Sequence, residues 1–509
     1  MKRLFFSLIF FALSWASLQA QVPADALRFS SLDVLGTART IGVGGGIGAL
    51  GADFSVMSTN PAGLAAFRRS EFTVTPYFSL NNTEATLDNS GNSTAVQKNK
   101  VAFSLNNLGL VFSRQGRNPN WKTSNIAIGL NRIASFNQTF TYRGESTGSY
   151  IDFFQEASID LAPSELSNFT TGLAFDTEAI YDLDDDLFYE TDVELNENAL
   201  LYKEQTIRRR GGINELSLAF SGNFKERLMI GVSLGFPILS YTEEKVYNEE
   251  DRADEVPAYV DMQFNENLTT TGSGVNLKLG LIFRLSQMIR LGAAIHTPTN
   301  YGTLVDNFET SMQHNYIDGD GNNQFFESAS PTDQGEFEYQ LKTPWRFIGS
   351  AGFIIKRSGF ITGEVEYLKY SGAKFDLTNT DNSQGTIDFQ DNLNSEIASI
   401  YQSAINLRVG GEFALKIFRF RAGVTLSGTP YADNYISDNP NIKGIGDTST
   451  AYALGFGVRQ QRYFLDFAFR FSDQESTFTP YTVSDIYPQN SVTTNAVRSN
   501  LIFTFGYKF

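Results

Sequence analysis

The stretch Asn500-Leu-Ile-Phe-Thr-Phe-Gly-Tyr-Lys-Phe509 alternates large apolar side chains with small or polar ones. A period of two predicts a β-strand, one face of which carries Leu501, Phe503, Phe505, Tyr507 and Phe509. The other face carries Asn500, Thr504, Gly506 and Lys508. In a soluble sandwich a further element would cover the aromatic face, but none follows in this sequence. Strands that meet lipid on one face and a lumen on the other show this pattern, so the stretch predicts a strand of a membrane barrel.

The same alternation recurs from about residue 70 onward, for example over 345–355 and 463–471. In these segments Phe and other apolar residues share one face, whereas charged residues such as Arg346, Asp466 and Arg470 fall on the opposite face. Charged side chains on the face away from lipid are expected where the interior of a barrel is wet.

The links between these segments alternate in length without a break. Short links occur near 114–121, 224–227, 285–288, 356–359, 416–418 and 459–462. Long polar segments occur near 81–100, 143–206, 247–272, 302–335, 372–400, 429–447 and 473–492. Outer-membrane barrels show this asymmetry, with short periplasmic turns and long external loops. The pattern therefore predicts an all-β, antiparallel transmembrane barrel of about 14 strands, with both ends on the periplasmic side.

We place the strands near 70–80, 100–114, 122–142, 207–225, 227–246, 273–285, 288–301, 336–356, 359–371, 401–416, 418–428, 448–460, 462–472 and 493–509. The alternative is a soluble, secreted all-β protein such as a tandem sandwich or a propeller. The sequence has no blade-length repeat, and the regular alternation of links favours the barrel.

Composition agrees with a membrane barrel and excludes one class of partner. The chain of 509 residues has 44 Phe, 22 Tyr and 43 Gly. Its formal net charge is −16 and its pI is about 4.7. An acidic chain lacks the basic face that nucleic acid requires, so no nucleic-acid partner is expected.

The N-terminus predicts secretion. Residues 1–20 have the features of a signal peptide, with Lys2 and Arg3, an apolar stretch over 4–13, and Leu18-Gln19-Ala20 before the expected cleavage site. The sequence has no Cys, so it has neither a lipidation site nor disulfides. No later run of eighteen apolar residues occurs, which leaves β-strands as the means of crossing a membrane.

Residues 21–69 do not alternate and are rich in Gly and Ala. They include Gly36 to Asp53, with the run Gly44-Gly45-Gly46, and the compact piece Ser58-Thr-Asn-Pro-Ala-Gly-Leu-Ala65. Small residues allow a backbone to pack closely against an inner wall. We therefore divide the chain into a signal peptide (1–20), a plug or hatch (21–69) and a barrel with long external loops (70–509).

The hatch carries a specific resemblance. The run from Gly36 through Gly44-Gly45-Gly46 and Asp53 to Asn60-Pro61-Ala62-Gly63-Leu64 resembles the hatch of the long-chain fatty acid transporter (FadL) family. The pieces 276–284, 290–292, 296–298 and 343–349 are also similar to strand sequences of that family, in the branch that transports toluene and fatty acids. Phe505, Tyr507 and Phe509 resemble the C-terminal signal that outer-membrane assembly machinery reads.

The resemblance implies a monomer in the outer membrane that passes long-chain fatty acids or other hydrophobic molecules inward without an energy source. Ligand would enter between the external loops, cross an apolar pocket above the hatch, and leave sideways through the wall. Hatch packing and gating would involve Gly44, Gly45, Gly46, Asn60, Pro61, Ala62 and Gly63. Pro237 and Pro298 lie within expected strands and predict a kink or bulge there. Such a kink is a place where the wall could open, and the alternative is a strand end near the rim. No Walker A pattern occurs, and neither a catalytic site nor a cofactor is expected.

Several other features have weaker alternatives. Gly46-Ile-Gly48-Ala-Leu-Gly51 matches a dinucleotide-binding pattern, but no strand precedes it. Asp318, Asp320 and Asn322 resemble half of a calcium loop. His296 and His314 are the histidines that would be available for haem. The segment 143–206 is long for the family, which keeps open a role as the protein-binding barrel of a secretion system.

Overall fold

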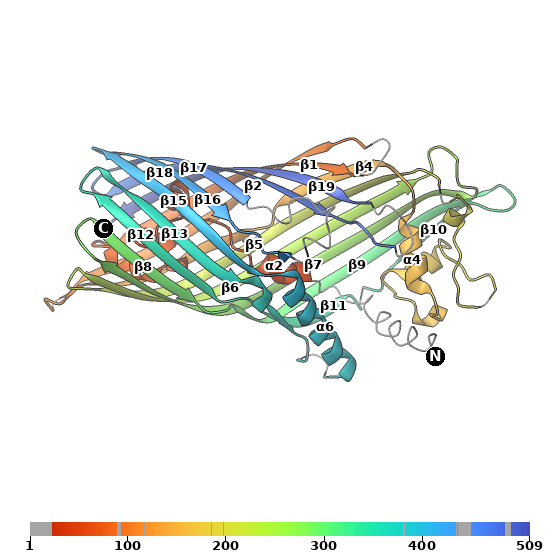
Figure 1. The fold of residues 1–509 in the computed structure, drawn as a ribbon, viewed down its shortest axis with the longest axis horizontal. Coiled ribbons are helices and arrows are strands. Elements are labelled where there is room, and N and C mark those ends of the chain that lie inside the picture. Colours follow the sequence, from red (N-terminus) through yellow and green to blue (C-terminus); the bar gives the residue numbers. More distant parts are fainter. Residues whose placement is uncertain are drawn as a thin grey trace.

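The computed structural model describes residues 23–509 except 89–92, 117, 185, 197, 333, 380–381, 434, 436–448 and 484–489. Nineteen strand segments form one antiparallel sheet, in which β1 (Glu71–Leu87) pairs with β19 (Val492–Lys508). This pairing closes the sheet into a barrel (Figure 1). Because some segments are parts of one strand, the barrel has 14 strands, which confirms the number predicted from the alternating links.

Most strands consist of one segment. Besides β1 and β19, these are β2 (Val96–Gln115), β5 (Leu201–Phe224), β6 (Leu228–Glu250), β7 (Tyr259–Arg284), β15 (Ser403–Leu415), β16 (Phe418–Ser427), β17 (Ser449–Arg459) and β18 (Tyr463–Phe478). The interrupted strands are β3 (Trp121–Ser135) with β4 (Gln138–Ser146), β8 (Ile289–His296) with β9 (Asn300–Ile317), β10 (Asn323–Ala329) with β11 (Glu336–Lys342) and β12 (Arg346–Ile355), and β13 (Gly359–Lys369) with β14 (Lys374–Asp376).

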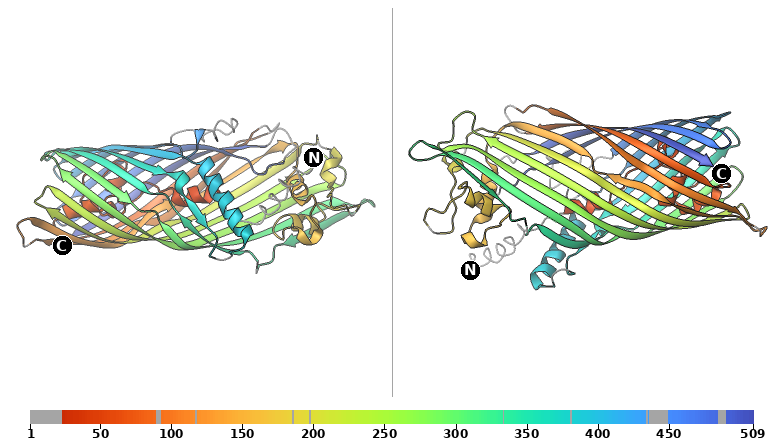
Figure 2. Two further views of the ribbon diagram at one scale, coloured as in Figure 1. Left: turned by 60° about the horizontal axis from the view of Figure 1, so that its bottom comes forward. Right: turned by 180° about the vertical axis from the view of Figure 1, so that it is seen from behind.

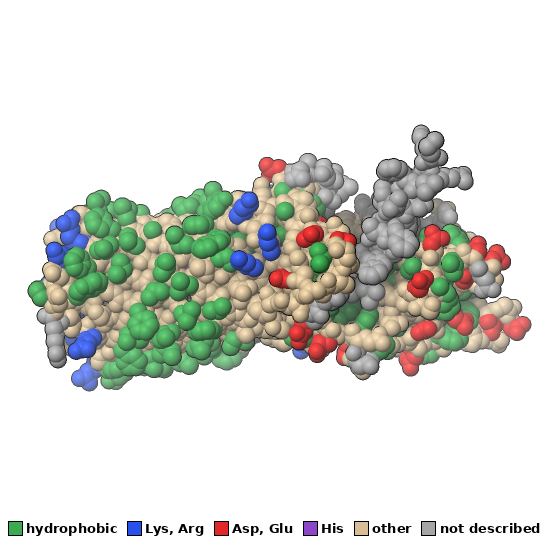
Figure 3. Space-filling view, turned by 90° about the horizontal axis from the view of Figure 1, so that it is seen from below, with side chains coloured by type: hydrophobic (Ala, Val, Ile, Leu, Met, Phe, Trp, Pro, Cys, Tyr) green, Lys and Arg blue, Asp and Glu red, His purple; other side chains and the backbone are tan. Residues whose placement is uncertain are grey.

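The outer face of the barrel is apolar, as the terminal strand predicted. Leu501, Phe503 and Phe505 of β19 are exposed, whereas Ile502 and Thr504 between them are buried. Figure 3 shows a belt of apolar side chains around the half of the barrel that carries the short turns. Basic side chains gather at the two borders of the belt, and acidic ones gather at the other end of the molecule (Figure 3). This distribution is that of a barrel held across a bilayer.

Part of the expected loop 143–206 forms a compact helical layer at the acidic end. It contains α4 (Tyr150–Ser158), η4 (Pro163–Glu165), α5 (Thr171–Asp176) and η5 (Asp192–Asn196). Its apolar side chains pack with the extended ends of β6, β7 and β9 into one core; examples are Ile151, Phe154, Tyr247, Phe264 and Met312. These strands therefore continue beyond the predicted boundaries, since the layer buries their far ends.

The layer contains a carboxyl group that titrates near neutral pH. Asp152 accepts a hydrogen bond from the backbone N–H of Ser149 at 2.6 Å, within the capping box of α4. Burial raises the pKa of the Asp152 carboxyl to about 7; the Ser149 N–H opposes this rise, and the charge of Glu249 adds to it.

Protonation of the Asp152 carboxyl therefore stabilises the folded helical layer. Because the folded pKa is raised above the unfolded value, this contribution to stability is fully present below about pH 4 and is lost as the pH rises through about 7. We expect the protection factors of the α4 amides, which are corrected for the intrinsic exchange rate at each pH, to be lower at pH 8 than at pH 5, and Asp152→Asn to remove most of that difference. An equal pH effect in the variant would contradict this assignment.

On the opposite side, α6 (Gln384–Ile400) packs against shorter strands. Its buried residues Leu393 and Ile397 join a cluster with Tyr370 of η6 (Tyr370–Gly372) and Phe375 of β14. In Figures 1 and 2 the helix projects from the side of the barrel beyond the ends of these strands. Among the described helices, none is long and apolar enough to cross a membrane.

The segment before the first strand lies inside the barrel (Figure 2, red). It contains α2 (Pro23–Ser30), α3 (Ala38–Gly42), η2 (Phe54–Ser58) and η3 (Pro61–Ala66). Asp53 caps η2 and Asn60 caps η3, which explains why the short helices begin where they do. The expected signal peptide at 1–20 lies outside the described residues.

Candidate functional site

One buried carboxylate holds the fold of the N-terminal segment. The Asp53 carboxylate accepts hydrogen bonds from the Thr37 hydroxyl at 2.8 Å, the Thr40 hydroxyl at 3.0 Å and the Ser55 N–H at 3.0 Å. These contacts join the start of α3 to the start of η2. The sequence comparison with hatch segments included Asp53, but this role depends on contacts that spacing alone does not reveal.

Asn60 joins the segment to the barrel wall. Its Nδ2 donates to the carbonyl of Gly48 at 2.7 Å and to that of Leu281 on β7 at 3.3 Å. Its Oδ1 accepts from the N–H of Ala62 at 3.2 Å. The side chain is fully buried, so it connects the glycine-rich run, η3 and the wall. These contacts are the reason that we retain Asn60 as a gating candidate.

The glycine-rich run touches the wall backbone to backbone. A Cβ on Gly42 would lie 3.2 Å from the Cα of Gly455, and a Cβ on Gly423 would overlap the backbone of Gly44. Gly44 and Gly45 also have positive φ angles of 69° and 85°. On the far side, Gly231 and Gly280 of the wall face Pro61 and Ala62 of η3. The wall glycines were not singled out in the sequence, because strand glycines show no partner until the segment is placed.

This contact supports a matched pair of variants. Gly423→Ala inserts a methyl group into the contact with Gly44, and overpacking of this kind costs about 1–3 kcal/mol. Gly349→Ala places the same methyl on the outer face, where nothing lies within 4 Å. We expect Gly423→Ala to make the segment 23–70 more sensitive to protease in detergent and Gly349→Ala to leave it unchanged. Equal cleavage of the two variants would contradict the packing described here.

Ion pairs line the inner wall at the level of the segment. Lys278 and Glu215 are paired at 2.6 Å, with exposed side-chain fractions of 4% and 1%. Glu215 also accepts a hydrogen bond from Ser58 of η2 at 3.1 Å. Glu364 pairs with Arg408 at 2.7 Å and accepts from the N–H of Gly48 at 3.0 Å. Charged side chains on the inner face of the wall, which predicted a wet interior, thus bind the N-terminal segment in part.

The interior beside the segment leaves little free space. A cavity of about 60 Å³ is lined by residues that include Asp33, Arg132, His296 and Arg346. Pockets that hold small-molecule ligands usually measure roughly 300–1,000 Å³. A ligand passing this point would therefore need the segment or its neighbours to move.

At the level of α2 the lumen is filled by an apolar and aromatic cluster. Its buried members include Phe29 of α2 together with Tyr241, Tyr301, Tyr339 and Leu341 of the strands. The guanidinium of Arg28, which pairs with Asp25, lies 4.4 Å from the centre of the Tyr241 ring. The rings fill most of the lumen at this level, and the charged groups among them are partnered: Glu243 and Asp306 accept hydrogen bonds from the hydroxyls of Tyr241 and Tyr339.

Beside this cluster the backbone ladder of the wall is interrupted. β2 pairs with β3 over 107–115, whereas β4 pairs with β5 in the described ladder and has no register with β2. Phe136 lies between β3 and β4 and packs against Phe29 and Tyr241 of the cluster. Val101 and Phe103 lie on the part of β2 that pairs with β1 but not with β3, and they are 69% and 66% exposed. The interruption therefore lies at the edge of the apolar cluster, where Phe136 packs against it.

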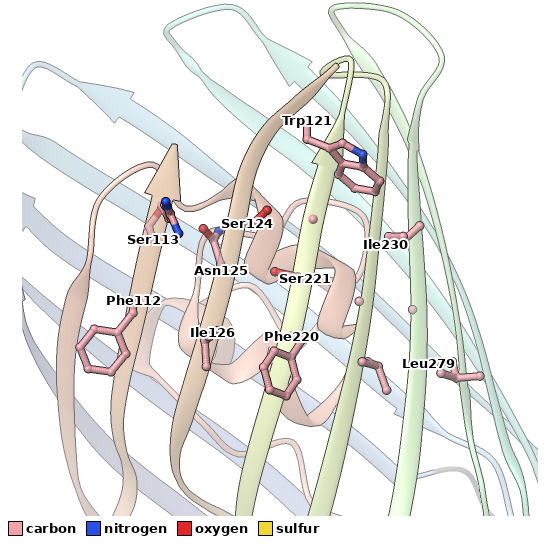
Figure 4. A pocket seen from close by; sticks show the side chains of 15 residues that line it. Phe112, Ser113, Trp121, Ser124, Asn125, Ile126, Phe220, Ser221, Ile230 and Leu279 are labelled. Carbon is pink, nitrogen blue, oxygen red and sulfur yellow. The ribbon is translucent and has the colours of Figure 1, made fainter. Parts of the chain in front are cut away.

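A wide groove lies on the outer face near the short turns (Figure 4). Its volume is about 1080 Å³, and its exposed lining includes Phe112, Ile126, Phe220 and Leu279. These side chains point away from the face of the wall against which η3 packs. The groove is an apolar surface for lipid rather than part of the lumen.

The two prolines expected to kink the wall differ. Pro298 lies in the interruption between β8 and β9, next to a second interruption between β11 and β12. In contrast, β6 continues through Pro237, which pairs with Glu215 of β5, although the ladder to β7 has no register at 236–237. At Pro237 the structure thus shows a local gap in one ladder, and a role of this residue in opening the wall stays a prediction. The larger interruption at Phe136–Asn137 contains no proline and was not predicted.

The remaining candidates have structural partners. The carboxylate of Asp318 accepts from the N–H groups of Asp320 and Asn322 at 3.0 and 2.8 Å, which stabilises the turn between β9 and β10. His296 Nε2 lies 2.6 Å from the carbonyl of Thr59, and His314 Nδ1 lies 3.0 Å from that of Thr177. Both imidazoles are buried. Within the described residues, no cluster of three or more acidic, His or Cys residues suits a metal ion.

No protein-family model and no curated protein matches the sequence. Solved structures do match it over nearly its whole length. The toluene transporter TodX of P. putida has a TM-score of 0.51 and 11% sequence identity, with 94% of this chain and 99% of that chain covered. The chain has the FadL fold. A Pseudomonas aeruginosa FadL homologue gives a TM-score of 0.51 and 12% identity, again with 94% and 99% covered.

The comparison confirms the resemblance at the level of the fold. The FadL fold comprises the 14-stranded barrel and the N-terminal segment that precedes the first strand.

Proposed function

We propose that this FadL-fold protein is a passive outer-membrane channel for hydrophobic small molecules, such as long-chain fatty acids or monoaromatic hydrocarbons. The observation that carries the proposal is the apolar aromatic cluster inside the barrel, which adjoins the ladder interruption at Phe136–Asn137. The N-terminal segment closes the axial route below it. A lumen of this kind excludes water-soluble cargo. The interruption at Phe136–Asn137 offers an apolar molecule a lateral exit through the wall.

The energetics support a lateral route. An apolar chain prefers a bilayer to water by about 0.8 kcal/mol for each methylene group. A path from the cluster past Phe136 into the bilayer avoids the aqueous step that an axial path would impose. In this proposal, movement of α2 and of the run around Gly44–Gly46 makes room in the cluster, while Asn60, Pro61, Ala62 and Gly63 anchor η3 to the wall. Pro298 lies at a further weak point of the wall.

The protein is proposed to act as a monomer in the outer membrane, where its apolar belt contacts lipid. Phe505, Tyr507 and Phe509 would supply the signal for the assembly machinery. The exposed aromatic face of β19 supports this role, since these side chains remain accessible on the outside of the barrel.

Uptake into liposomes tests the proposal. Vesicles with the wild-type barrel are expected to take up oleate and toluene faster than empty vesicles, and Asn60→Ala with Pro61→Ala is expected to change the rate. Gly349→Ala serves as the matched wall variant. No acceleration by the wild type, together with capture of a protein partner, would favour the secretion role instead. A Soret band that His296→Ala removes would favour haem binding.

A further inference from the structure

Lysines meet on the outer face of the barrel just beyond the apolar belt. Lys342 of β11 lies directly opposite Lys374 of β14, and Asn300 of β9 lies opposite Lys342 on its other side. Both lysines are exposed, whereas Leu341 and Phe375 next to them are buried. The two ammonium groups therefore belong to one outward-facing row that crosses three strands. Lys369 at the end of β13 is also exposed.

Aromatic side chains fix the height of this row in the bilayer. Trp345 and Phe347 are stacked with ring centroids 6.4 Å apart, and Tyr367 lies 6.4 Å from Phe347. All three are exposed: Tyr367 comes two residues before Lys369 on β13, and Trp345 and Phe347 come three and five residues after Lys342. Aromatic residues of this kind mark the border between hydrocarbon and headgroups. The lysines therefore lie at headgroup level, and Figure 3 shows basic side chains at this border of the belt.

A groove between α6 and the strands adjoins the lysine pair. Its volume is about 680 Å³, and Lys342 and Lys374 form one side together with Asn300 and Gln340. Polar residues of α6, among them Asn394 and Ser395, form the other side. Two carboxylates, those of Asp376 and Asp391, also reach the groove. Ammonium, amide and hydroxyl groups around one groove suit a phosphorylated sugar.

The charge on the row needs a counter-ion. Like charges directly opposite each other in a sheet are destabilising. None of the three lysines forms an ion pair within 4.0 Å with another described residue. Asp376 is two residues from Lys374, but its Oδ1 accepts from the N–H and hydroxyl of Thr378 at 3.1 and 2.8 Å. Asp376 and Asp391 line other parts of the groove, and the cross-strand pair of Lys342 and Lys374 is the part of it that suits an anionic group.

We propose that the groove between α6, β11 and β14 binds the phosphorylated sugar headgroup of a glycolipid in the outer leaflet, with Lys342 and Lys374 on the phosphate. The acyl chains of that lipid would lie along the apolar belt below Trp345, Phe347 and Tyr367. The inference goes beyond the proposed transport and rests only on the placement of the barrel in the membrane with its long segments outward.

Native mass spectrometry of the detergent-purified full barrel tests the site. The probe is diphosphoryl lipid A, compared with the same lipid after phosphatase treatment and with inorganic phosphate. We expect a lipid A adduct on the wild type that Lys342→Gln/Lys374→Gln weakens at least tenfold. Lys356→Gln/Lys416→Gln, in exposed turns at the other end of the barrel, removes the same charge and is expected to retain the adduct.

Each outcome decides the proposal. Equal adducts on both double variants, or equal binding of the phosphatase-treated lipid, would overturn it. Binding of inorganic phosphate as tight as that of lipid A would also overturn it, because the source would then be a free ion. Heat-dependent mobility on gels shows whether each variant forms a folded barrel. Because no transport is measured, failure of this experiment is distinct from failure of the proposed function.

Discussion

Uptake is expected to stop when Gly48→Cys and Ser350→Cys are joined by a disulfide, and to return when the bond is reduced. A Cβ on Gly48 would lie 3.3 Å from the Cβ of Ser350 on β12, a few tenths of an ångström below the range of about 3.5–4.5 Å that disulfides prefer. The natural chain has no Cys, so no other thiol competes. The bond would fix the glycine-rich run to the wall.

Vesicle uptake of oleate and toluene measures the effect, with a fall of at least about tenfold expected, equivalent to about 1.4 kcal/mol in the barrier. The matched control joins Gly349→Cys to Ala293→Cys, which are opposite each other on β12 and β8 and both face outward. This bond constrains the same strand but leaves the N-terminal segment free, so uptake should persist. Full transport through the oxidised Gly48–Ser350 pair would show that the run does not move.

Loss of the buried amine in Lys278→Met is expected to cost about 3–5 kcal/mol of unfolding free energy, because it leaves the Glu215 carboxylate unpaired in the interior. The double variant Glu215→Leu/Lys278→Met should recover much of that loss, since replacing both partners removes the uncompensated charge. Urea unfolding in lipid vesicles measures each free energy, and the double-mutant cycle gives the coupling.

An exposed pair provides the control for this cycle. Arg68 and Glu226 are 3.0 Å apart, but their side chains are 57% and 43% exposed. Arg68→Gln should therefore change stability by only about 0–1 kcal/mol. If Lys278→Met lowered the unfolding free energy as little as Arg68→Gln, the interior around Glu215 would have to be hydrated. The packing of η2 against the wall through the Ser58–Glu215 hydrogen bond would then be wrong.

The features that the sequence predicts are those that local patterns encode. Alternation identifies the lipid-facing aromatics of β19, and the lengths of the links identify the strand number. Close backbone packing also agrees with the small residues at Gly44–Gly46. These signals are local because successive side chains of a β-strand point to opposite faces, so the pattern of neighbouring residues identifies each face.

Features that depend on partners far apart in the chain were not predictable. The interruption after Ser135 has no proline, and its cause lies partly in the Ser135 N–H, which donates to Asp33 of the N-terminal segment at 3.0 Å. The pair of Lys342 and Lys374 arises from the register between β11 and β14, which are separated in the chain by β12, β13 and η6. The helical layer at 150–196 resembles a polar loop in sequence, because its apolar residues are spread over short helices that only the barrel rim brings together.

The seam between β1 and β19 sets an order for biogenesis. The first strand meets the last, so the cylinder stays open until synthesis of residue 508 is complete. The N-terminal segment packs closely both against earlier strands, at Gly231 and Gly280, and against late strands, at Gly410 and Gly423. Its full set of wall contacts is therefore available only once the late strands have been added. The N-terminal segment is therefore enclosed when β1 and β19 pair, and the continuous ladder at this seam leaves it no exit between these two strands.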